Sequence, residues 1–277
     1  MTAPPQPQDK YTQAGGLRLH YVDWGNPAAQ PMLLLHGLQD CARSWDFFAS
    51  AMRGDYHVVA LDHRGHGDSD RAAPDRYRLT DYVSDVDALV ASASLRDIVV
   101  VGHSAGGRNA FLHAVRHPDA VKALVVADID PDAVNEESAA MFRRYDAESD
   151  EWESMDVVVE RLRSRQPNST QEMLAHQALH MTKGAQGGRR VWKRDRRLLA
   201  PYERPDLWDE WSQVRFPTLI VRGRQSNLLT HEVGVRMREA IPLARLAELE
   251  GGGHWFYQEF PGAFEATIRW FLEDLPS

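Results

Sequence analysis

The stretch Asp97–Gly107 constrains this chain of 277 residues more than any other. It starts with four apolar residues, Ile98–Val101, and continues as Gly-His-Ser-Ala-Gly into a segment with helical spacing. A short uninterrupted apolar run is typical of a strand buried on both faces. A serine on a sharp strand-to-helix turn has a strained backbone, and only small residues two positions away let strand and helix approach. Gly102 and Gly106 meet this requirement, which makes Ser104 a candidate nucleophile.

Apolar runs alternate with segments of helical spacing along most of the chain. The expected strands are Met32–Leu35, Val58–Leu61, Ile98–Val101, Ala123–Ala127, Thr218–Val221 and Arg245–Leu249. The expected helices between and after them are Asp81–Ala93, Ala105–His117, Val233–Ala240 and Phe260–Leu272. This alternation predicts an α/β fold with a mostly parallel, doubly wound sheet and helices on both of its faces.

The alternation breaks between about Pro131 and Ser212, where charged residues and tryptophans become frequent. Within this segment, Met141–Leu162 and Thr170–Met181 are predicted to be helices of a cap over the carboxyl edge of the sheet, where open α/β sheets bind ligands. The expected organisation is a flexible leader at 1–10, a core at 11–131, a helical cap at 132–212 and the rest of the core at 213–277.

Composition excludes several classes of function. The 32 basic and 40 acidic residues give a net charge of −8, which attracts neither nucleic acid nor an anionic membrane. A single cysteine, Cys41, permits no intrachain disulfide and no cysteine-based metal cluster, so a reducing, cytoplasmic setting is expected. The Pro- and Gln-rich leader lacks the apolar centre of a signal peptide. We expect a monomer or homodimer that uses no cofactor and no metal.

Four motifs together resemble the α/β-hydrolase superfamily. They are His36-Gly37, the run from Asp62 to Ser69, the turn around Ser104, and Gly253-His254. The resemblance extends from about Leu17 to the C-terminus and implies a nucleophile–histidine–acid triad. It implies that His254 is the base and that the backbone amides of Leu38 and Ala105 form the oxyanion hole. By the same resemblance, His36, His63, His66 and His103 belong to structural loop motifs.

The acid of the triad departs from the commonest pattern of the superfamily. Relatives with a similar loop after Thr218–Val221 usually have an aspartate where this chain has Asn227, and an amide carries no charge to support a histidine. Other branches, including haloalkane dehalogenases, zearalenone lactonases and a hydrolase of the (acetamidomethylene)succinate type, place the acid after the strand that follows the nucleophile helix. The resemblance then implies Asp128 as the acid, with Asp130 as the alternative and Asn227 as a helper.

The cap sequence contains two opposed charge blocks, acidic over Asp146–Glu160 and basic over Arg189–Arg197. The blocks either pair with each other or turn one or two arginines inward to bind a substrate carboxylate. Arg143 and Arg144 are equally eligible for the second role. The remaining candidates for substrate contact are Trp192, Trp255 and His36.

The leading hypothesis is a serine hydrolase of a carboxylic ester, lactone or amide that forms an acyl-enzyme and uses water as co-substrate. The dehalogenase and epoxide hydrolase branches attack with an aspartate where this chain has Ser104, so their chemistry is excluded. Two alternatives stay open. One is hydrolysis of a C–C bond with the same triad, and the other is a ligand receptor with weak turnover, suggested by Asn227.

Overall fold

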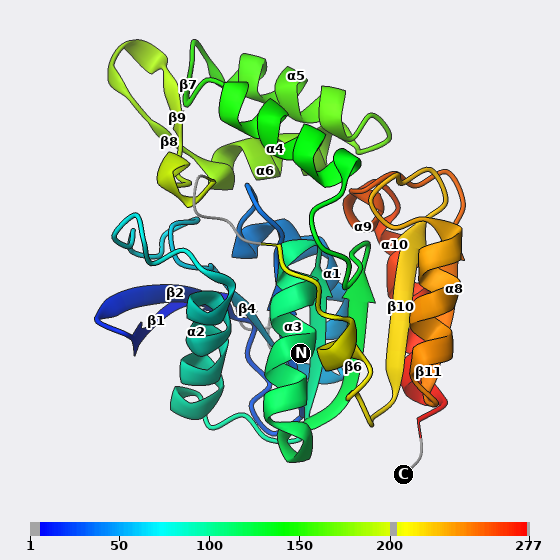
Figure 1. The fold of residues 1–277 in the computed structure, drawn as a ribbon. Helices are drawn as coiled ribbons and strands as arrows, with labels where there is room; N and C mark the ends of the chain where they lie inside the picture. Colours follow the sequence, from blue (N-terminus) through cyan, green and yellow to red (C-terminus); the bar gives the residue numbers. More distant parts are fainter. Residues whose placement is uncertain (1–5, 200–203, 276–277) are drawn as a thin grey trace.

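The computed structural model describes residues 6–199 and 204–275. A mixed sheet of eight strands, in the order β1-β2-β4-β3-β5-β6-β10-β11, runs through the centre of the core (Figure 1). Its strands are β1 (Gln8–Ala14), β2 (Leu17–Asp23), β3 (Gln30–Leu35), β4 (Tyr56–Leu61), β5 (Ile98–His103), β6 (Val121–Ala127), β10 (Thr218–Gly223) and β11 (Ala244–Leu249). From β4 to β11 neighbouring strands are parallel, whereas β2 pairs antiparallel with both β1 and β4.

Helices cover both faces of the sheet, which confirms the predicted α/β fold. They are α1 (Asp46–Met52), α2 (Leu79–Ser92), α3 (Ala105–Arg116), α7 (Trp208–Trp211), α8 (His231–Ala240), α9 (Phe256–Glu259) and α10 (Pro261–Glu273), with 3-10 turns η1 (Ala42–Trp45) and η2 (Pro118–Ala120). Alternate residues of β5 enter opposite cores, Val100 with Phe111 of α3 and Val101 with Phe264 of α10. This alternation explains why the strand is apolar at successive positions.

The six strands predicted from apolar runs all occur, with ends that differ by up to two residues. The β1–β2 hairpin has no counterpart among the predicted strands. Its first strand, β1, is at the edge of the sheet, and only Thr12 and Ala14 of that strand are buried, so it contains no apolar run. Gln8–Lys10, expected to belong to a leader, form the start of β1, and residues 1–5 of that leader lie outside the described residues.

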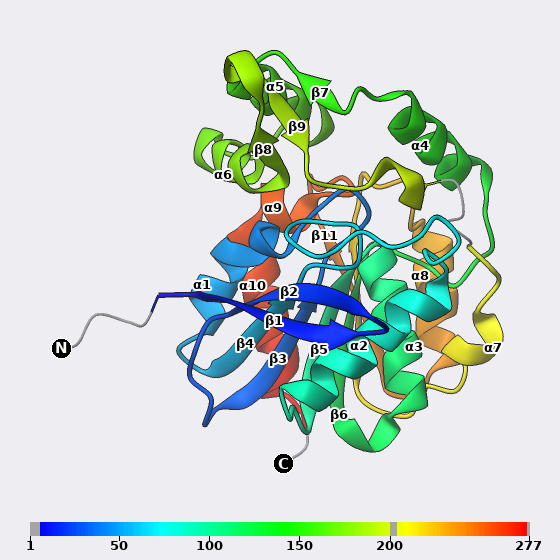
Figure 2. The same ribbon diagram turned by 90° about the vertical axis from the view of Figure 1, so that its left-hand side faces the viewer.

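The cap segment forms a separate layer above the carboxyl edge of the parallel strands (Figures 1 and 2). It contains α4 (Glu136–Ala147), α5 (Met155–Arg165) and α6 (Gln171–Met181), the strands β7 (Glu151–Trp152), β8 (Thr182–Gly184) and β9 (Arg190–Trp192), and the 3-10 turns η3 (Gln186–Gly188) and η4 (Arg196–Leu198). The three strands form a small antiparallel sheet.

Two expectations for the cap need correction. The single helix expected over Met141–Leu162 is two helices, because Ser154 caps α5 by accepting a hydrogen bond from the Val157 amide. The cap is also not wholly helical, since it includes the β7-β9-β8 sheet. Near its predicted end at 212, Trp211 of α7 packs on Phe111 of the core helix α3. The precise division at 132 and 212 stays a prediction.

Within residues 6–199 and 204–275, no helix combines the length and the apolar character needed to cross a bilayer.

Candidate active site

Ser104 occupies a sharp turn between β5 and α3, as the motif predicts. Its backbone has φ 53° and ψ −127°, a conformation that L-residues rarely adopt. A Cβ on Gly102 would lie 2.4 Å from the Gly106 carbonyl oxygen, and one on Gly106 would lie 2.3 Å from that of Leu35. Neither glycine can therefore be replaced without moving the backbone. The packing of strand against helix at these two positions holds Ser104 in its strained conformation.

Asp128 and His254 lie together at the carboxyl edge of the sheet. Asp128 follows β6 with a φ of 51° and is fully buried, and His254 precedes α9. The Nδ1 atom of His254 lies 2.7 Å from Oδ2 of Asp128, which is hydrogen-bond distance. The Ser104 amide donates to the Ala127 carbonyl at 2.9 Å, so the serine and Asp128 lie at the ends of neighbouring strands. The ring of His103 donates to the His254 carbonyl at 2.8 Å.

The Ser104 hydroxyl makes no hydrogen bond to another described residue, and its contact to His254 is therefore not formed in this structure. Such contacts in hydrolases are often long without substrate and tighten in the complex. With Nδ1–H directed to Asp128, the lone pair of His254 is at Nε2, the nitrogen remote from the acid.

Burial changes the acid–base properties of this pair. It lowers the pKa of His254, and the positive charge of Arg165 lowers it further. It also raises the pKa of Asp128, and a hydrogen bond from the Ser226 hydroxyl is the largest opposing contribution. The lowered pKa leaves the His254 ring neutral at neutral pH, which is the form that can accept a proton.

Ser226, which the sequence analysis did not single out, makes the hydrogen bond to the acid that was expected of Asn227. Its hydroxyl donates to Oδ2 of Asp128, the same oxygen that contacts His254, while Asn227 is exposed and hydrogen-bonds neither residue. The only signal in the sequence is that Ser226 lies next to Asn227, the position at which relatives often have the acid.

Asp130 is held elsewhere. It forms a buried ion pair with Arg204 and accepts a hydrogen bond from the Asp132 amide at 2.9 Å. Of the two carboxylates considered from the sequence, Asp128 is the one in contact with His254.

The amides of Leu38 and Ala105 lie beside the nucleophile. A Cβ on Gly37, which precedes Leu38, would lie 2.9 Å from the Cβ of Ser104, and Ala105 is the first residue of α3. Both residues line one small cavity, and neither amide donates a hydrogen bond within the described residues. Free amides at a helix start and an adjacent loop are the groups that stabilise a developing oxyanion.

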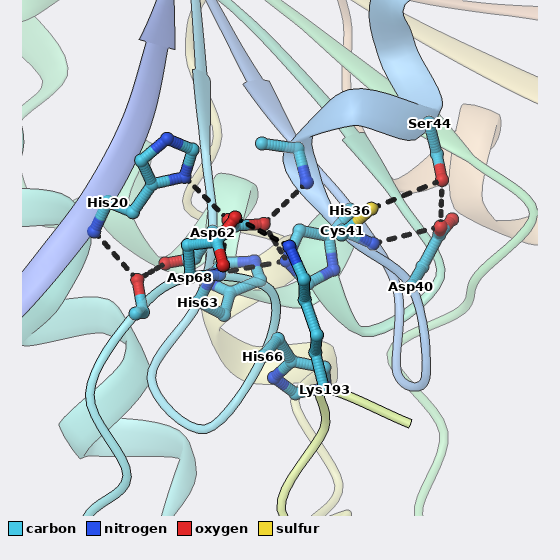
Figure 3. A network of polar contacts seen from close by, with 12 residues as sticks. His20, His36, Asp40, Cys41, Ser44, Asp62, His63, His66, Asp68 and Lys193 are labelled. Atoms are coloured by element: carbon cyan, nitrogen blue, oxygen red, sulfur yellow. Dashed lines mark hydrogen bonds and ion pairs between the residues drawn. The ribbon is translucent and has the colours of Figure 1, made fainter. Parts of the chain in front are cut away.

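The ring of His36 binds backbone groups of two loops and lines the same small cavity as Leu38 and Ala105, and its contact with substrate stays a prediction. It is fully buried, its Nδ1 donates to the Gly37 carbonyl at 2.7 Å, and its Nε2 accepts from the His63 amide at 3.1 Å. Figure 3 shows His36 within a polar network that also includes His20 and Asp62. Asp62 binds the His20 ring at 2.6 Å and the Ala42 amide at 2.7 Å. This network holds the loop that carries the Leu38 amide.

A cavity of about 800 Å³ lies between the cap and the core, next to His254. From the core it is lined by Ser226, Asn227, Leu228, His254 and Trp255, and from the cap by residues of α4, α5 and β7, including Met141, Tyr145 and Trp152. Its size fits a small to medium organic molecule. Trp255 is among the lining residues, and its contact with substrate stays a prediction.

Trp192 does not line that cavity. It is buried in an apolar cluster with Val158 and Leu174, and its ring packs edge-on against Trp152, which does line it. The nearest basic residues on either side are themselves at most half-exposed, and Arg194 is buried. Trp192 is therefore part of the apolar cluster of the cap and lies behind Trp152 rather than at the wall of this cavity.

Of the two adjacent cap arginines considered for carboxylate binding, one lines the cavity and one points into solvent. Arg143 points outward, with 66% of its side chain exposed and an ion pair to Glu136, whereas Arg144 lines the cavity. One residue along a helix changes the direction of a side chain by about 100°. Arg165, at the end of α5, also lines the cavity and stacks 3.9 Å above the ring of Trp255. Its Nε and Nη2 atoms are buried without a hydrogen-bond partner.

The two opposed charge blocks of the cap pair with each other. Arg189 contacts Glu151 at 2.7 Å, and Arg194 and Arg196 contact Asp150 at 3.0 and 3.1 Å. The cationic groups of the cavity come instead from α4 and α5.

The sheet order, the serine on its strand-to-helix turn and the covered cavity at the carboxyl edge define a hydrolase of the α/β type. The chain belongs to the alpha/beta hydrolase fold family, whose sequence model matches residues 30–261. A 2-(acetamidomethylene)succinate hydrolase from Mesorhizobium japonicum is 27% identical over 244 residues, which cover 87% of each chain. A 3-hydroxybutyrate-oligomer hydrolase from Cupriavidus necator is 29% identical over 242 residues, covering 81% of this chain and 82% of the relative.

A solved structure of an E-2-(acetamidomethylene)succinate hydrolase superposes with a TM-score of 0.89 at 25% identity and covers 97% of this chain and all of its own. The cap is therefore shared with that protein as well as the core. These relatives are named for different substrates, so the comparisons establish the fold and the hydrolase class and leave the substrate open.

Proposed function

We propose that this protein is a serine hydrolase that cleaves a carboxylic ester, lactone or amide carrying a second, anionic carboxylate. The observation that supports the chemistry most is the 2.7 Å contact between His254 and Asp128 at the carboxyl edge of the sheet, beside Ser104 on its strained turn. Ser104 is the nucleophile, His254 the base and Asp128 the acid.

In the first half of the reaction, Nε2 of His254 takes the Ser104 proton while Oγ attacks the carbonyl carbon. The carbonyl oxygen becomes an oxyanion that accepts hydrogen bonds from the Leu38 and Ala105 amides. Asp128 accepts a hydrogen bond from Nδ1–H of His254 and thereby stabilises the charged imidazole. The tetrahedral intermediate then collapses, His254 gives its proton to the departing alcohol or amine, and an acyl-enzyme remains.

In the second half, a water molecule attacks the acyl carbon and His254 takes one of its protons. Collapse of the second tetrahedral intermediate breaks the bond to Oγ, and the proton returns to Ser104. The net result is addition of one water across the substrate bond, so no cofactor is consumed.

The anionic part of the proposal rests on Arg165 and Arg144. The guanidinium of Arg165 is packed on Trp255, has buried nitrogens without partners, and lines the same cavity as His254. A carboxylate accepts two parallel hydrogen bonds from such a group. Arg144 lines the cavity without an ion-pair partner among the described residues and can bind a carboxylate from the α4 side. The relative from Mesorhizobium japonicum is named for a succinate derivative, which agrees with a substrate that carries a carboxylate.

A fluorophosphonate probe tests the proposed chemistry, because it reacts covalently with activated serines. We expect labelling of the native wild-type protein, and loss of labelling in Ser104→Ala and after heat denaturation of the wild type. Absence of labelling in folded wild-type protein would reject the serine hydrolase and favour a receptor of the same fold.

A further inference from the structure

A second group of potential ligands lies away from the cavity, where the cap rests on the core. His176 and His180 lie one turn apart on α6, and Asp46 is the first residue of α1. One ligand atom from each of these three side chains lies within 4.8 Å of the other two. None of the three residues lines the cavity next to His254.

Two of these side chains have unused ligand capacity. Asp46 is 8% exposed, and its Oδ1 atom is buried without a hydrogen-bond partner, whereas its Oδ2 lies 3.0 Å from Nε2 of His176. The ring of His180 makes no hydrogen bond to another described residue, although it lies 4.5 Å from the ring of His176. A buried carboxylate oxygen without a partner is costly, and a bound cation would remove that cost.

The chemistry of this set suits a transition metal. Imidazole is the commonest nitrogen ligand of Zn²⁺, and carboxylate oxygens such as those of Asp46 are also common ligands. Bonds of about 2.0–2.2 Å in a tetrahedral arrangement separate two ligand atoms by about 3.3 Å. At present Nε2 of His176 carries a proton, since it lies 3.2 Å from the Arg43 carbonyl oxygen and 3.0 Å from Oδ2 of Asp46. This proton has to move to Nδ1 or leave before Nε2 can bind a metal.

Positive groups nearby oppose a cation. The Arg43 guanidinium lies 3.4 Å from Oδ2 of Asp46, and its charge and that of Lys193 act on His180. Arg43 has a second partner, Asp9, at 2.5 Å, and Lys193 pairs with Asp68 at 2.7 Å. Each cation therefore retains a carboxylate of its own when a metal takes Asp46.

We propose that Asp46, His176 and His180 form a binding site for a divalent transition metal of the Zn²⁺ class, with water as the fourth ligand. The site joins the cap helix α6 to the core helix α1, and Figure 2 shows α6 directly above the α1 region. Metal bound there connects cap and core through three bonds and stabilises the folded protein, because it binds the folded state alone.

A similar set elsewhere provides a control within the same molecule. His113 on α3 and His117, the residue that follows the helix, have the same spacing in sequence, and one ligand atom of each lies with one of Asp87 of α2 within 4.8 Å. There Oδ1 of Asp87 already contacts His113 at 2.7 Å and His117 at 3.3 Å, and Arg116 lies 3.7 Å from Oδ2. Since this carboxylate is already shared, we expect the Asp46 set to bind metal more tightly.

The test uses the full chain without an affinity tag, titrated with Zn²⁺ by calorimetry and with Co²⁺ by visible absorption. The proposal requires one tight site in the wild type and a rise in the thermal unfolding temperature with Zn²⁺. His180→Ala should weaken binding by at least about 100-fold, since loss of an outer partner of a metal ligand already costs 10–100-fold. His117→Ala should leave binding unchanged, and Arg43→Gln should tighten it.

Turnover of a p-nitrophenyl ester checks that each variant is folded, because none of these residues belongs to the proposed catalytic set. If His180→Ala does not fold, His180→Gln replaces it, since glutamine keeps most of the volume but is a poor ligand. The proposal is wrong if wild-type protein binds no Zn²⁺, if His180→Ala binds as the wild type does, or if binding is lost in His117→Ala instead.

Discussion

The core and the cap of this protein are stabilised in different ways. In the core, apolar strands lie between two layers of helices, and close contacts at Gly102 and Gly106 leave no freedom around Ser104. The cap has a smaller apolar cluster around Val158 and Leu174, and its short helices and small sheet are also joined by ion pairs such as Arg161 with Glu148. The cavity lies between the two regions. This difference suggests that the core determines the chemistry and the cap determines which substrate reaches it.

The strongest test of the core's role is Asp128→Asn. An amide at this position cannot support the charged imidazole and can favour the wrong tautomer of His254, so turnover of a p-nitrophenyl ester should fall by about 10⁴-fold. Asn227→Ala, on the loop where relatives often have the acid, should retain most of the wild-type rate. Near wild-type turnover in Asp128→Asn, with the protein shown to be folded, would mean that another group orients His254.

The cap's role is tested by Arg165→Gln. Loss of hydrogen bonds to a charged group costs about 1.5–3 kcal/mol, so kcat/KM for a carboxylate-bearing ester should fall by about 10- to 100-fold. The rate with a neutral ester of similar size should change little. Arg143→Gln is the matched control, since Arg143 is on the outer side of α4. Equal losses for charged and neutral esters would contradict substrate recognition by Arg165 and indicate a packing role on Trp255.

A smaller effect is expected for Ser226→Ala, which removes one hydrogen bond from Asp128. Such a bond is worth about 0.5–1.5 kcal/mol, so kcat should fall by up to about tenfold while KM stays close to the wild-type value. Ser226→Thr keeps the hydroxyl and should recover most of the rate. A change confined to KM would place Ser226 in substrate binding instead of support of the acid.

The smallest expected effect concerns the pH dependence of kcat/KM, through which Arg165 of the cap acts on the base His254. Burial and the Arg165 charge lower the pKa of His254 below its usual 6.5, so the base stays neutral as the pH falls through 6.5. The profile of kcat/KM should therefore stay flat there and decline only at lower pH. Arg165→Gln removes a positive charge and should move the decline to higher pH. An unchanged profile in that variant would show that the cap charge does not reach the base.

The sequence alone predicted the parts of this protein that depend on local patterns. The apolar run Ile98–Val101 followed by two glycines around Ser104 requires a buried strand, a tight turn and a helix, because no other arrangement satisfies those side chains at that spacing. The resemblance to the α/β-hydrolase superfamily, rather than a local pattern, pointed to His254 and to Asp128. It left Asp130 as an alternative, because both aspartates follow the same strand.

Only the tertiary structure decided which side chains meet across the chain. Asp130 pairs with Arg204, and Ser226 supports Asp128 across 98 positions in sequence. In the cap, helix ends and side-chain directions placed Trp192 inside and Arg143 outside, while Arg144 and Arg165 reached the cavity. Cap helices have weak apolar patterns and their charges can pair in several ways at similar free energy, so their partners are determined by packing on the core rather than by local sequence.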